Sequence, residues 1–302
     1  MRILLRYFTG TGNTGLCAGF LADAFKEAGH VVDFAVGDAS FDINQYDLIG
    51  LGYPIHAFNP PQVFLNQVKA MPEAKKDYFI FKVSGEPFWM NNSSSSQIAG
   101  IMNRKGYRKV GEKHFLMPYN IIFRYKDPVM KQMYLYLPAL TKAYAQDLLQ
   151  GKAETIRYGL PSRVFAFLFR IEWIAPRVNA HLVSFRKKKC ITCDKCLRDC
   201  PQHAIYKTDN GTLKINPSKC AMCMRCTLNC PVDAIRFGIM NPWKVTGGFN
   251  YPKLLQSEAI DPNYINANTK GYFRLFNKYF DRQRAMLKDH GIQDPVEAYC
   301  SR

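Results

Sequence analysis

Eight of the ten cysteines in this chain of 302 residues lie in two short blocks that share one spacing. Each block is a Cys-x2-Cys-x2-Cys-x3-Cys-Pro run, and the runs end at Pro201 and Pro231. Three thiolates spaced in this way can wrap one face of an iron–sulfur cubane, whereas the fourth cysteine of each run reaches the other cluster. The spacing therefore predicts two [4Fe-4S] clusters, the first held by Cys190, Cys193, Cys196 and Cys230 and the second by Cys220, Cys223, Cys226 and Cys200.

Zinc and disulfide bonds fit these blocks less well. A zinc ribbon uses two Cys-x2-Cys pairs, and four-coordinate zinc would leave several cysteines without a role. Disulfides require an oxidising compartment, but Met1 leads directly into an apolar segment that lacks the pattern of a secretory signal peptide. We therefore expect a cytoplasmic protein with reduced cysteines that bind iron–sulfur clusters.

The region around the cysteine blocks resembles the bacterial two-cluster ferredoxins over residues 187–238. Each half carries the small and apolar pair that follows the proline in that family, Ala204-Ile205 and Ala234-Ile235. The resemblance implies a small α+β domain in which these pairs pack against the two clusters.

The N-terminal stretch has the pattern of a phosphate-binding loop. Residues 2–8 are short and apolar, as in a buried parallel strand, and a helical pattern runs from Leu16 to Gly29. The loop between them can bind phosphate oxygens through free NH groups at the helix N-terminus and through threonine hydroxyls. It contains no lysine, so it is neither a P-loop nor a dinucleotide fingerprint. A tight turn with a helix cap is the alternative to a phosphate site formed by Thr9, Gly10, Thr11, Gly12, Asn13 and Thr14.

This loop resembles the FMN-phosphate loop of the flavodoxin family, Thr/Ser-x-Thr-Gly-x-Thr, which it matches at Thr9, Thr11, Gly12 and Thr14. The resemblance implies bound FMN and an α/β fold whose five-stranded, doubly wound parallel sheet has the order 2-1-3-4-5. Apolar segments fit the remaining strands at 31–36, 47–52, 78–83 and 114–117, and helices near 61–71, 94–105 and 128–150.

Two further loops follow the third and fourth expected strands, and ligands of such sheets sit at the carboxyl ends of the strands. In flavodoxins these loops flank the flavin ring, so the resemblance implies ring contacts from Tyr53, His56, Ser84, Gly85 and Trp89. Tyr53, His56 and Trp89 each fit a core or surface position equally well. His56 is the candidate proton donor beside the flavin, and no catalytic residue is assigned.

Several other residues of this half have structural interpretations. The polar run 91–96 is expected to form a mobile loop and a helix N-cap. His114 is expected to precede the fifth strand as a structural histidine. Cys17 is expected to pack as a small hydrophobic residue, and Cys300 to be exposed.

The chain is expected to contain four parts: a flavodoxin-like domain at 1–152, an amphipathic segment at 153–186, a ferredoxin domain at 187–238, and a C-terminal strap and helix at 239–302. The amphipathic segment sets large apolar residues against arginines. This pattern fits helices that dock one cofactor domain on the other, which we favour, and it also fits an interfacial membrane helix. No apolar run reaches the length of a transmembrane helix.

The formal net charge is +17, and it stays strongly positive after the thiolates and cluster cores are counted. It favours an acidic redox protein, such as a ferredoxin-like donor or acceptor, or an anionic membrane surface, and no nucleic-acid-binding motif accompanies it. The whole chain, including a Met-Pro-x-Asn segment at 117–120, resembles bacterial and archaeal flavodoxin–ferredoxin fusion proteins. That resemblance implies an electron carrier with two clusters and FMN. A reductase acting directly on a small molecule and a flavin-free scaffold or sensor are the alternatives.

Overall fold

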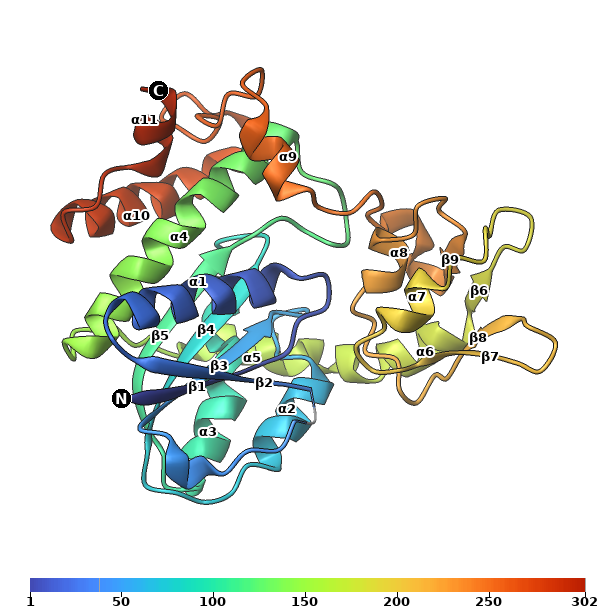
Figure 1. Cartoon of the computed structure of the whole chain (residues 1–302), viewed down its shortest axis with the longest axis horizontal. Helices are drawn as coiled ribbons and strands as arrows, with labels where there is room; N and C mark the ends of the chain where they lie inside the picture. Colours follow the sequence, from blue (N-terminus) through green and yellow to red (C-terminus); the bar gives the residue numbers. More distant parts are fainter. Residues whose placement is uncertain (38, 302) are drawn as a thin grey trace.

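The computed structural model describes residues 1–37 and 39–301, and they form two lobes joined by a narrow waist (Figure 1). The larger lobe is built on a five-stranded sheet in which every neighbouring pair is parallel. Its order, β2-β1-β3-β4-β5, confirms the predicted doubly wound topology. The strands are β1 (Arg2–Tyr7), β2 (Val31–Val36), β3 (Leu48–Pro54), β4 (Asp77–Ser84) and β5 (Arg108–Leu116).

Alternation of side chains along the strands builds an apolar core on each face of the sheet. Ile3 and Leu5 of β1 pack into one core with residues of α1 and α4, whereas Leu4 packs into the other core with residues of α2 and α3. Both faces are thus covered, which is why the strands are apolar almost throughout. The four helices are α1 (Asn13–Glu27), α2 (Gln62–Lys69), α3 (Ser96–Arg104) and α4 (Asp127–Leu149).

The smaller lobe carries the two cysteine blocks. It contains two antiparallel strand pairs, β6 with β9 and β7 with β8, and two one-turn helices, which confirms the predicted α+β character. Ala204, Ile205, Ala234 and Ile235 are all buried in it. Its elements are β6 (Val183–Phe185), α7 (Lys195–Arg198), β7 (Ile205–Lys207), β8 (Leu213–Ile215), α8 (Arg225–Leu228) and β9 (Ile235–Phe237).

Segments on both sides of the smaller lobe run back to the larger one. The C-terminal helices gather around α4 (Figure 1), where Lys131 donates hydrogen bonds to the carbonyl oxygens of Ser257 and Ile260, both at 2.8 Å. No helix among the described residues is long and apolar enough to cross a membrane. The flanking elements are α5 (Leu160–Leu168), a 3-10 helix (Phe169–Trp173) and α6 (Ala175–His181), then α9 (Tyr251–Gln256), α10 (Asn277–Asp289) and α11 (Pro295–Cys300).

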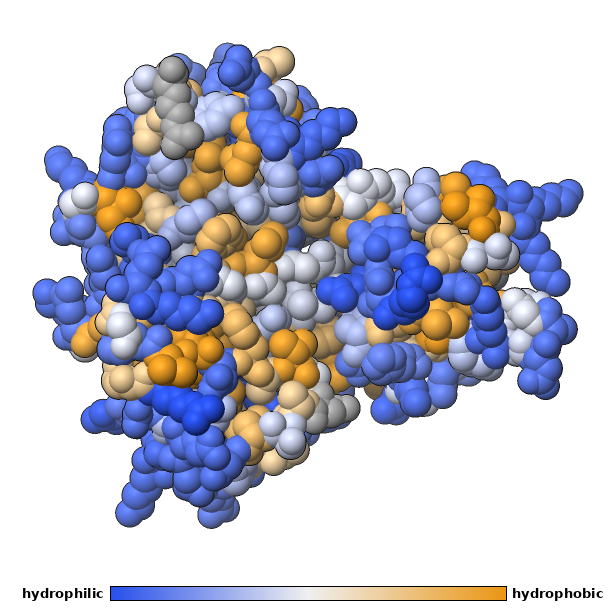
Figure 2. Space-filling view, in the orientation of Figure 1, coloured by the Kyte–Doolittle hydropathy of each residue, from blue (hydrophilic) through white to orange (hydrophobic). Residues whose placement is uncertain are grey.

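Hydrophilic side chains cover the outer edges of both lobes in the view of Figure 2, and hydrophobic side chains gather towards the middle of the molecule. In the same view hydrophilic side chains lie between the two lobes and hydrophobic patches also reach the surface of the smaller lobe. The chain as a whole is strongly basic.

Two expectations about the larger lobe are wrong in detail. Strand β5 begins at Arg108, so His114 lies inside the strand rather than before it, and its ring nitrogen is 2.8 Å from Ser84 Oγ. The polar run 91–96 is also not an exposed loop, because it lies mostly in a 3-10 helix (Trp89–Ser95) whose serine side chains are buried. Hydrophilic residues can occupy this buried position because their polar groups find hydrogen-bond partners, several of them in a charged pair beneath the helix.

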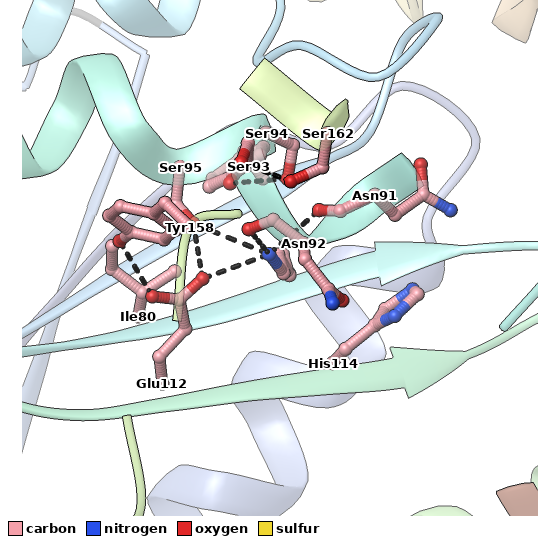
Figure 3. Close-up of polar contacts among 12 residues, drawn as sticks. Ile80, Asn91, Asn92, Ser93, Ser94, Ser95, Glu112, His114, Tyr158 and Ser162 are labelled. Atoms are coloured by element: carbon pink, nitrogen blue, oxygen red, sulfur yellow. Dashed lines mark hydrogen bonds and ion pairs between the residues drawn. The ribbon is translucent and has the colours of Figure 1, made fainter. Parts of the chain in front are cut away.

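That pair consists of Lys82 of β4 and Glu112 of β5, and Figure 3 shows Glu112 beneath the serine-rich segment. Lys82 Nζ lies 2.8 Å from Glu112 Oε1, and both side chains are fully buried. Lys82 also donates hydrogen bonds to the carbonyl oxygens of Asn91 at 2.9 Å and Asn92 at 3.0 Å. Burial alone would raise the pKa of Glu112, but Lys82 and Lys109 together lower it, so the carboxylate stays ionised. The pair thereby anchors the 3-10 helix to the sheet.

We expect Glu112→Gln to destabilise the fold by about 3–5 kcal/mol, because Lys82 would be left in a fully buried site without its counter-ion. Urea unfolding followed by circular dichroism would measure the loss. Asp77→Asn is the matched control, since Asp77 pairs with Arg108 on the same two strands but in an exposed position, and it should have little effect. An equal loss in both variants would contradict this role for the buried pair.

Candidate functional site

A cavity of about 450 Å³ opens where β1, β3 and β4 end, which is the position where doubly wound sheets bind their ligands. Its size is in the range of small-molecule and cofactor sites. The loop after each of these strands contributes to its wall, and the segment 117–122 closes another side. Residues of the smaller lobe complete the wall, namely Met222, Met224 and Met240.

The predicted phosphate loop forms one end of this cavity. Thr9, Gly10, Thr11, Asn13 and Thr14 all line it. Helix α1 begins at Asn13 without a side-chain cap, so the NH groups of its first turn are available to an anion. Gly12 precedes the helix with a φ of 108°, a conformation that favours glycine. The loop therefore has the donors that a phosphate group requires.

Asn13 has a structural contact that the sequence did not suggest. Its amide donates a hydrogen bond to the carbonyl oxygen of Pro118 at 3.1 Å, and its Oδ1 accepts one from the Tyr251 hydroxyl at 2.8 Å. Tyr251 belongs to the C-terminal region, 238 positions along the chain. The side chain of Asn13 thus braces the loop from behind.

The structure brings together three of the five residues expected beside the flavin ring. His56, Ser84 and Gly85 line the cavity. Tyr53 does not, because its side chain is fully buried in the core beneath the sheet, where its hydroxyl lies 3.2 Å from Ser94 Oγ. Trp89 does not line the cavity either, since its ring packs edge-on against Phe165 of α5. The structure therefore corrects the expectation that Tyr53 and Trp89 lie beside the flavin ring.

Aromatic and sulfur-containing residues that were not predicted from the sequence line the cavity instead of Tyr53 and Trp89. The ring of Tyr119 lies so close to Gly85 that a Cβ atom there would come within 2.4 Å of it. Phe88 also lines the cavity, as do five methionines, whose flexible side chains adapt to flat ring systems. The Met-Pro-x-Asn segment was the signal for Tyr119, because Tyr119 is its variable position. The methionines are Met90, Met117, Met222, Met224 and Met240.

Among the described residues that line the cavity, Glu86 alone carries a carboxylate. Asn91 Nδ2 donates a hydrogen bond to its Oε1 at 3.1 Å, but the buried Oε2 has no hydrogen-bond partner among the described residues. Burial raises the pKa of Glu86, while Tyr119 and Asn91 oppose the rise. Burial also lowers the pKa of His56, to about 4, which leaves its imidazole neutral at pH 7. Burial therefore favours the neutral form of both side chains, the protonated carboxyl of Glu86 and the neutral imidazole of His56.

Thiols of the two blocks interact in two sets, Cys196 with Cys190, Cys193 and Cys230, and Cys223 with Cys220 and Cys200. These sets are compatible with the crossed ligand assignment, which stays a prediction. Burial raises the pKa of Cys196 to about 11, and the nearby thiols of Cys190, Cys230 and Cys193 add to the rise. Burial likewise raises the pKa of Cys223 to about 12, with Cys220 and Cys200 adding to it. Within the described residues, no three cysteine, histidine or acidic side chains are arranged to hold a single metal ion.

The group around Cys223 surrounds a small cavity of its own. That cavity is lined by Cys200, Cys220, Cys223 and Cys226 together with Pro201, Ala204 and Ile205. The backbone NH groups of Ala204 and Met222 donate hydrogen bonds to the sulfur atoms of Cys200, at 3.3 Å, and Cys220, at 3.4 Å. Four converging thiols with NH···S hydrogen bonds fit the ligand set of an iron–sulfur centre.

This second cysteine group lies directly against the phosphate loop. A Cβ atom on Gly10 would come within 2.8 Å of both Cβ and the carbonyl oxygen of Cys223. Arg225, at the start of α8, donates a hydrogen bond to the Gly10 carbonyl oxygen, and Asn120 Nδ2 donates one to the Cys223 carbonyl oxygen at 3.3 Å. The two candidate cofactor sites therefore share a wall.

Replacing Glu86 with Gln tests the burial of this carboxyl group through the pH dependence of stability. A carboxyl whose pKa is raised by folding favours the folded state below its unfolded pKa of about 4.3, and this contribution is lost as pH rises through the folded pKa. Glu86→Gln should therefore raise the melting temperature at pH 7, with a gain that shrinks as pH falls towards 4.5. The exposed Glu73→Gln is the control. A gain that does not change with pH would refute this account.

Residues 189–234 match the protein family described as 4Fe-4S dicluster domain. Among curated proteins, none matches the chain significantly.

Solved structures resemble the larger lobe. The flavodoxin of Streptococcus pneumonia TIGR4 is 15% identical over 50% of this chain and 99% of its own, with a TM-score of 0.38. Flavodoxin 1 of Bacillus cereus is 13% identical over 50% of this chain and 98% of its own, with a TM-score of 0.38. Rubredoxin oxygen:oxidoreductase of Desulfovibrio gigas is 18% identical over 51% of this chain and 37% of its own, with a TM-score of 0.35. The chain thus joins a domain with the flavodoxin-like strand order to a 4Fe-4S dicluster domain.

Proposed function

We propose that this protein is an iron–sulfur flavoprotein that moves electrons between two [4Fe-4S] clusters and an FMN. The observation that carries the proposal is the contact of Gly10 with Cys223, a predicted cluster ligand that lies against the predicted phosphate loop. FMN, when bound, exchanges one or two electrons, whereas a cluster passes them singly. A shared wall between the two sites suits transfer between these two kinds of centre.

The chain's own residues support FMN at this cavity in three ways. The uncapped N-terminus of α1, with Thr11 and Thr14 beside it, supplies donors for a phosphate. Tyr119 and Phe88 supply flat apolar surface for a ring. Glu86 can hold a proton at Oε2, which balances charge when electrons arrive nearby.

The order of the centres follows from the placement of the cysteines. The group of Cys200, Cys220, Cys223 and Cys226 is next to the cavity, and the thiol of Cys196 in the other group lies close enough to raise the pKa of Cys226. Cys193 of that other group is exposed. We infer that electrons pass between a partner protein and the outer cluster, then to the inner cluster, and then to the cavity.

Direct reduction of a small molecule is less well supported. That alternative relied on Trp89, His56 and the serine-rich run as pocket residues. Trp89 lies outside the cavity, the serines are buried against the lobe, and His56 is neutral at pH 7. The contact between the two sites instead favours a carrier with a protein partner.

The exposed cations before the first cysteine block suit an acidic partner. Lys187, Lys188 and Lys189 are all exposed and lead directly into Cys190. A negatively charged ferredoxin would be attracted to the surface from which the outer cluster is most accessible.

Exchange of single ligands tests the two-cluster relay. Cys200→Ser should remove the inner cluster and about half of the iron, and it should stop electron transfer from the outer cluster to the flavin. Cys193→Ser should remove the outer cluster and leave the inner one beside the flavin. Iron and sulfide content, electron paramagnetic resonance and the visible spectrum of anaerobically purified protein would show the difference. If Cys200→Ser instead spared the cluster of Cys220, Cys223 and Cys226, the crossed arrangement would be wrong.

Salt dependence tests the acidic partner. Reduction by an acidic ferredoxin should slow about tenfold or more as ionic strength rises from about 0.05 to 0.5 M. Replacing Lys187, Lys188 and Lys189 with Gln should slow the reaction at low salt and weaken its salt dependence. Lys278→Gln with Lys288→Gln, two exposed cations on α10, is the control. Rates independent of salt would exclude electrostatic docking.

A further inference from the structure

In the helical segment between the two lobes, small residues rather than large apolar ones pack against the rest of the protein. Ser162 and Ala166 of α5 are buried. Ser162 Oγ lies 2.6 Å from Ser93 Oγ of the buried 3-10 helix, and the carbonyl oxygen of Ala166 accepts a hydrogen bond from Asn59 Nδ2 at 2.8 Å. Asn179 and Ala180 of α6 are buried in the same way. One face of the segment is therefore fully used for docking.

Its large apolar residues point to solvent instead. Leu160 is 75% exposed and Ile171 is 71% exposed, and four more large apolar side chains between positions 160 and 178 are more than half exposed. They follow one another at steps of seven, one, three, three and four residues along α5, the 3-10 helix and α6, so each of these elements exposes at least one of them. We call this set the apolar stripe: Leu160, Phe167, Leu168, Ile171, Ile174 and Val178. Single exposed apolar residues are ordinary, but a continuous row marks an interaction site.

Arginines accompany the apolar stripe at a regular interval. Arg163, Arg170 and Arg177 are seven residues apart, which is about two helical turns. Arg163 and Arg177 are exposed, and the Arg170 guanidinium lies 5.2 Å from the centre of the Phe167 ring. Over positions 157–189 the sequence has eight arginines and lysines and a single acidic residue, Glu172. The apolar stripe is therefore set in a strongly cationic surface.

We propose that the apolar stripe binds the surface of an anionic lipid membrane. Apolar side chains on one side of an interfacial helix enter the boundary of the acyl chains, while long cationic side chains reach the phosphates of the headgroups. The excess of arginine and lysine over acidic residues in this segment suits anionic lipid, which attracts each nearby cation. This inference does not depend on the proposed electron transfer.

Charge argues against a second copy of the chain as the occupant. A symmetric dimer places the same patch of each copy against the other. Here that contact would bring Arg163, Arg170 and Arg177 of one copy towards the same arginines of its partner, and like charges in an interface are unfavourable. An anionic surface removes this conflict.

Vesicle flotation of the anaerobically purified holoprotein tests the proposal. The probes are vesicles of phosphatidylcholine alone and vesicles with about one-third phosphatidylglycerol. We expect binding to the anionic vesicles, and a loss of about tenfold or more in the variant L168Q/I171Q. Its matched control is V31Q/V36Q, which alters two valines of β2 that are 59% and 46% exposed and should bind as the parent protein does.

A second pair of variants separates the electrostatic contribution. R163Q/R177Q should bind the anionic vesicles less tightly, whereas K278Q/K288Q, which removes two exposed cations of α10, should not. Circular dichroism shows whether each variant remains folded. No binding by the parent protein to either vesicle, or equal binding by L168Q/I171Q, would overturn the proposal. A parent dimer that L168Q/I171Q converts to monomer, with no vesicle binding, would assign the apolar stripe to a second copy instead.

Discussion

The close approach of Gly10 to Cys223 is the contact on which the rest of the arrangement depends. Any side chain at position 10 would collide with the backbone and Cβ of Cys223, so the phosphate loop can meet the cysteine lobe only through bare backbone. Arg225 holds the two together at the Gly10 carbonyl oxygen. This contact turns two separate domains into neighbours that share one wall, and the proposed relay rests on it.

Segments outside the two candidate cofactor sites hold the two lobes together. Tyr251 braces Asn13 behind the phosphate loop, and Arg124 donates hydrogen bonds to the carbonyl oxygens of Thr246 and Gly248 at 3.1 and 2.7 Å. Residues after the second cysteine block thus tie the smaller lobe to the larger one before the chain returns to α4. The C-terminal part therefore acts as a strap whose function is to hold two sites in register.

Buried polar groups support the docking of α5 on the larger lobe. The ion pair of Lys82 and Glu112 allows a serine-rich 3-10 helix to lie in the interior, and that helix in turn receives Ser162 of α5. Because α5 docks through small side chains, its large apolar residues are left on the outer surface. The buried polar groups beneath α5 and the exposed apolar residues on its outer side therefore have the same cause, which is the docking of α5 through its small side chains.

The sequence by itself determined the local chemistry and the topology. Cysteine spacing predicted two crossed groups of thiols, and the resemblance of the N-terminal loop to flavodoxins predicted the parallel sheet, because both rest on short-range sequence patterns. Only the tertiary structure decided which side chains meet across long distances. In the folded protein Tyr53 lies in the core and Trp89 packs against Phe165 of α5. Glu86 and Tyr119 line the cavity, and Cys223 lies against Gly10. Contacts between residues some two hundred positions apart depend on how lobes pack, which no local pattern encodes.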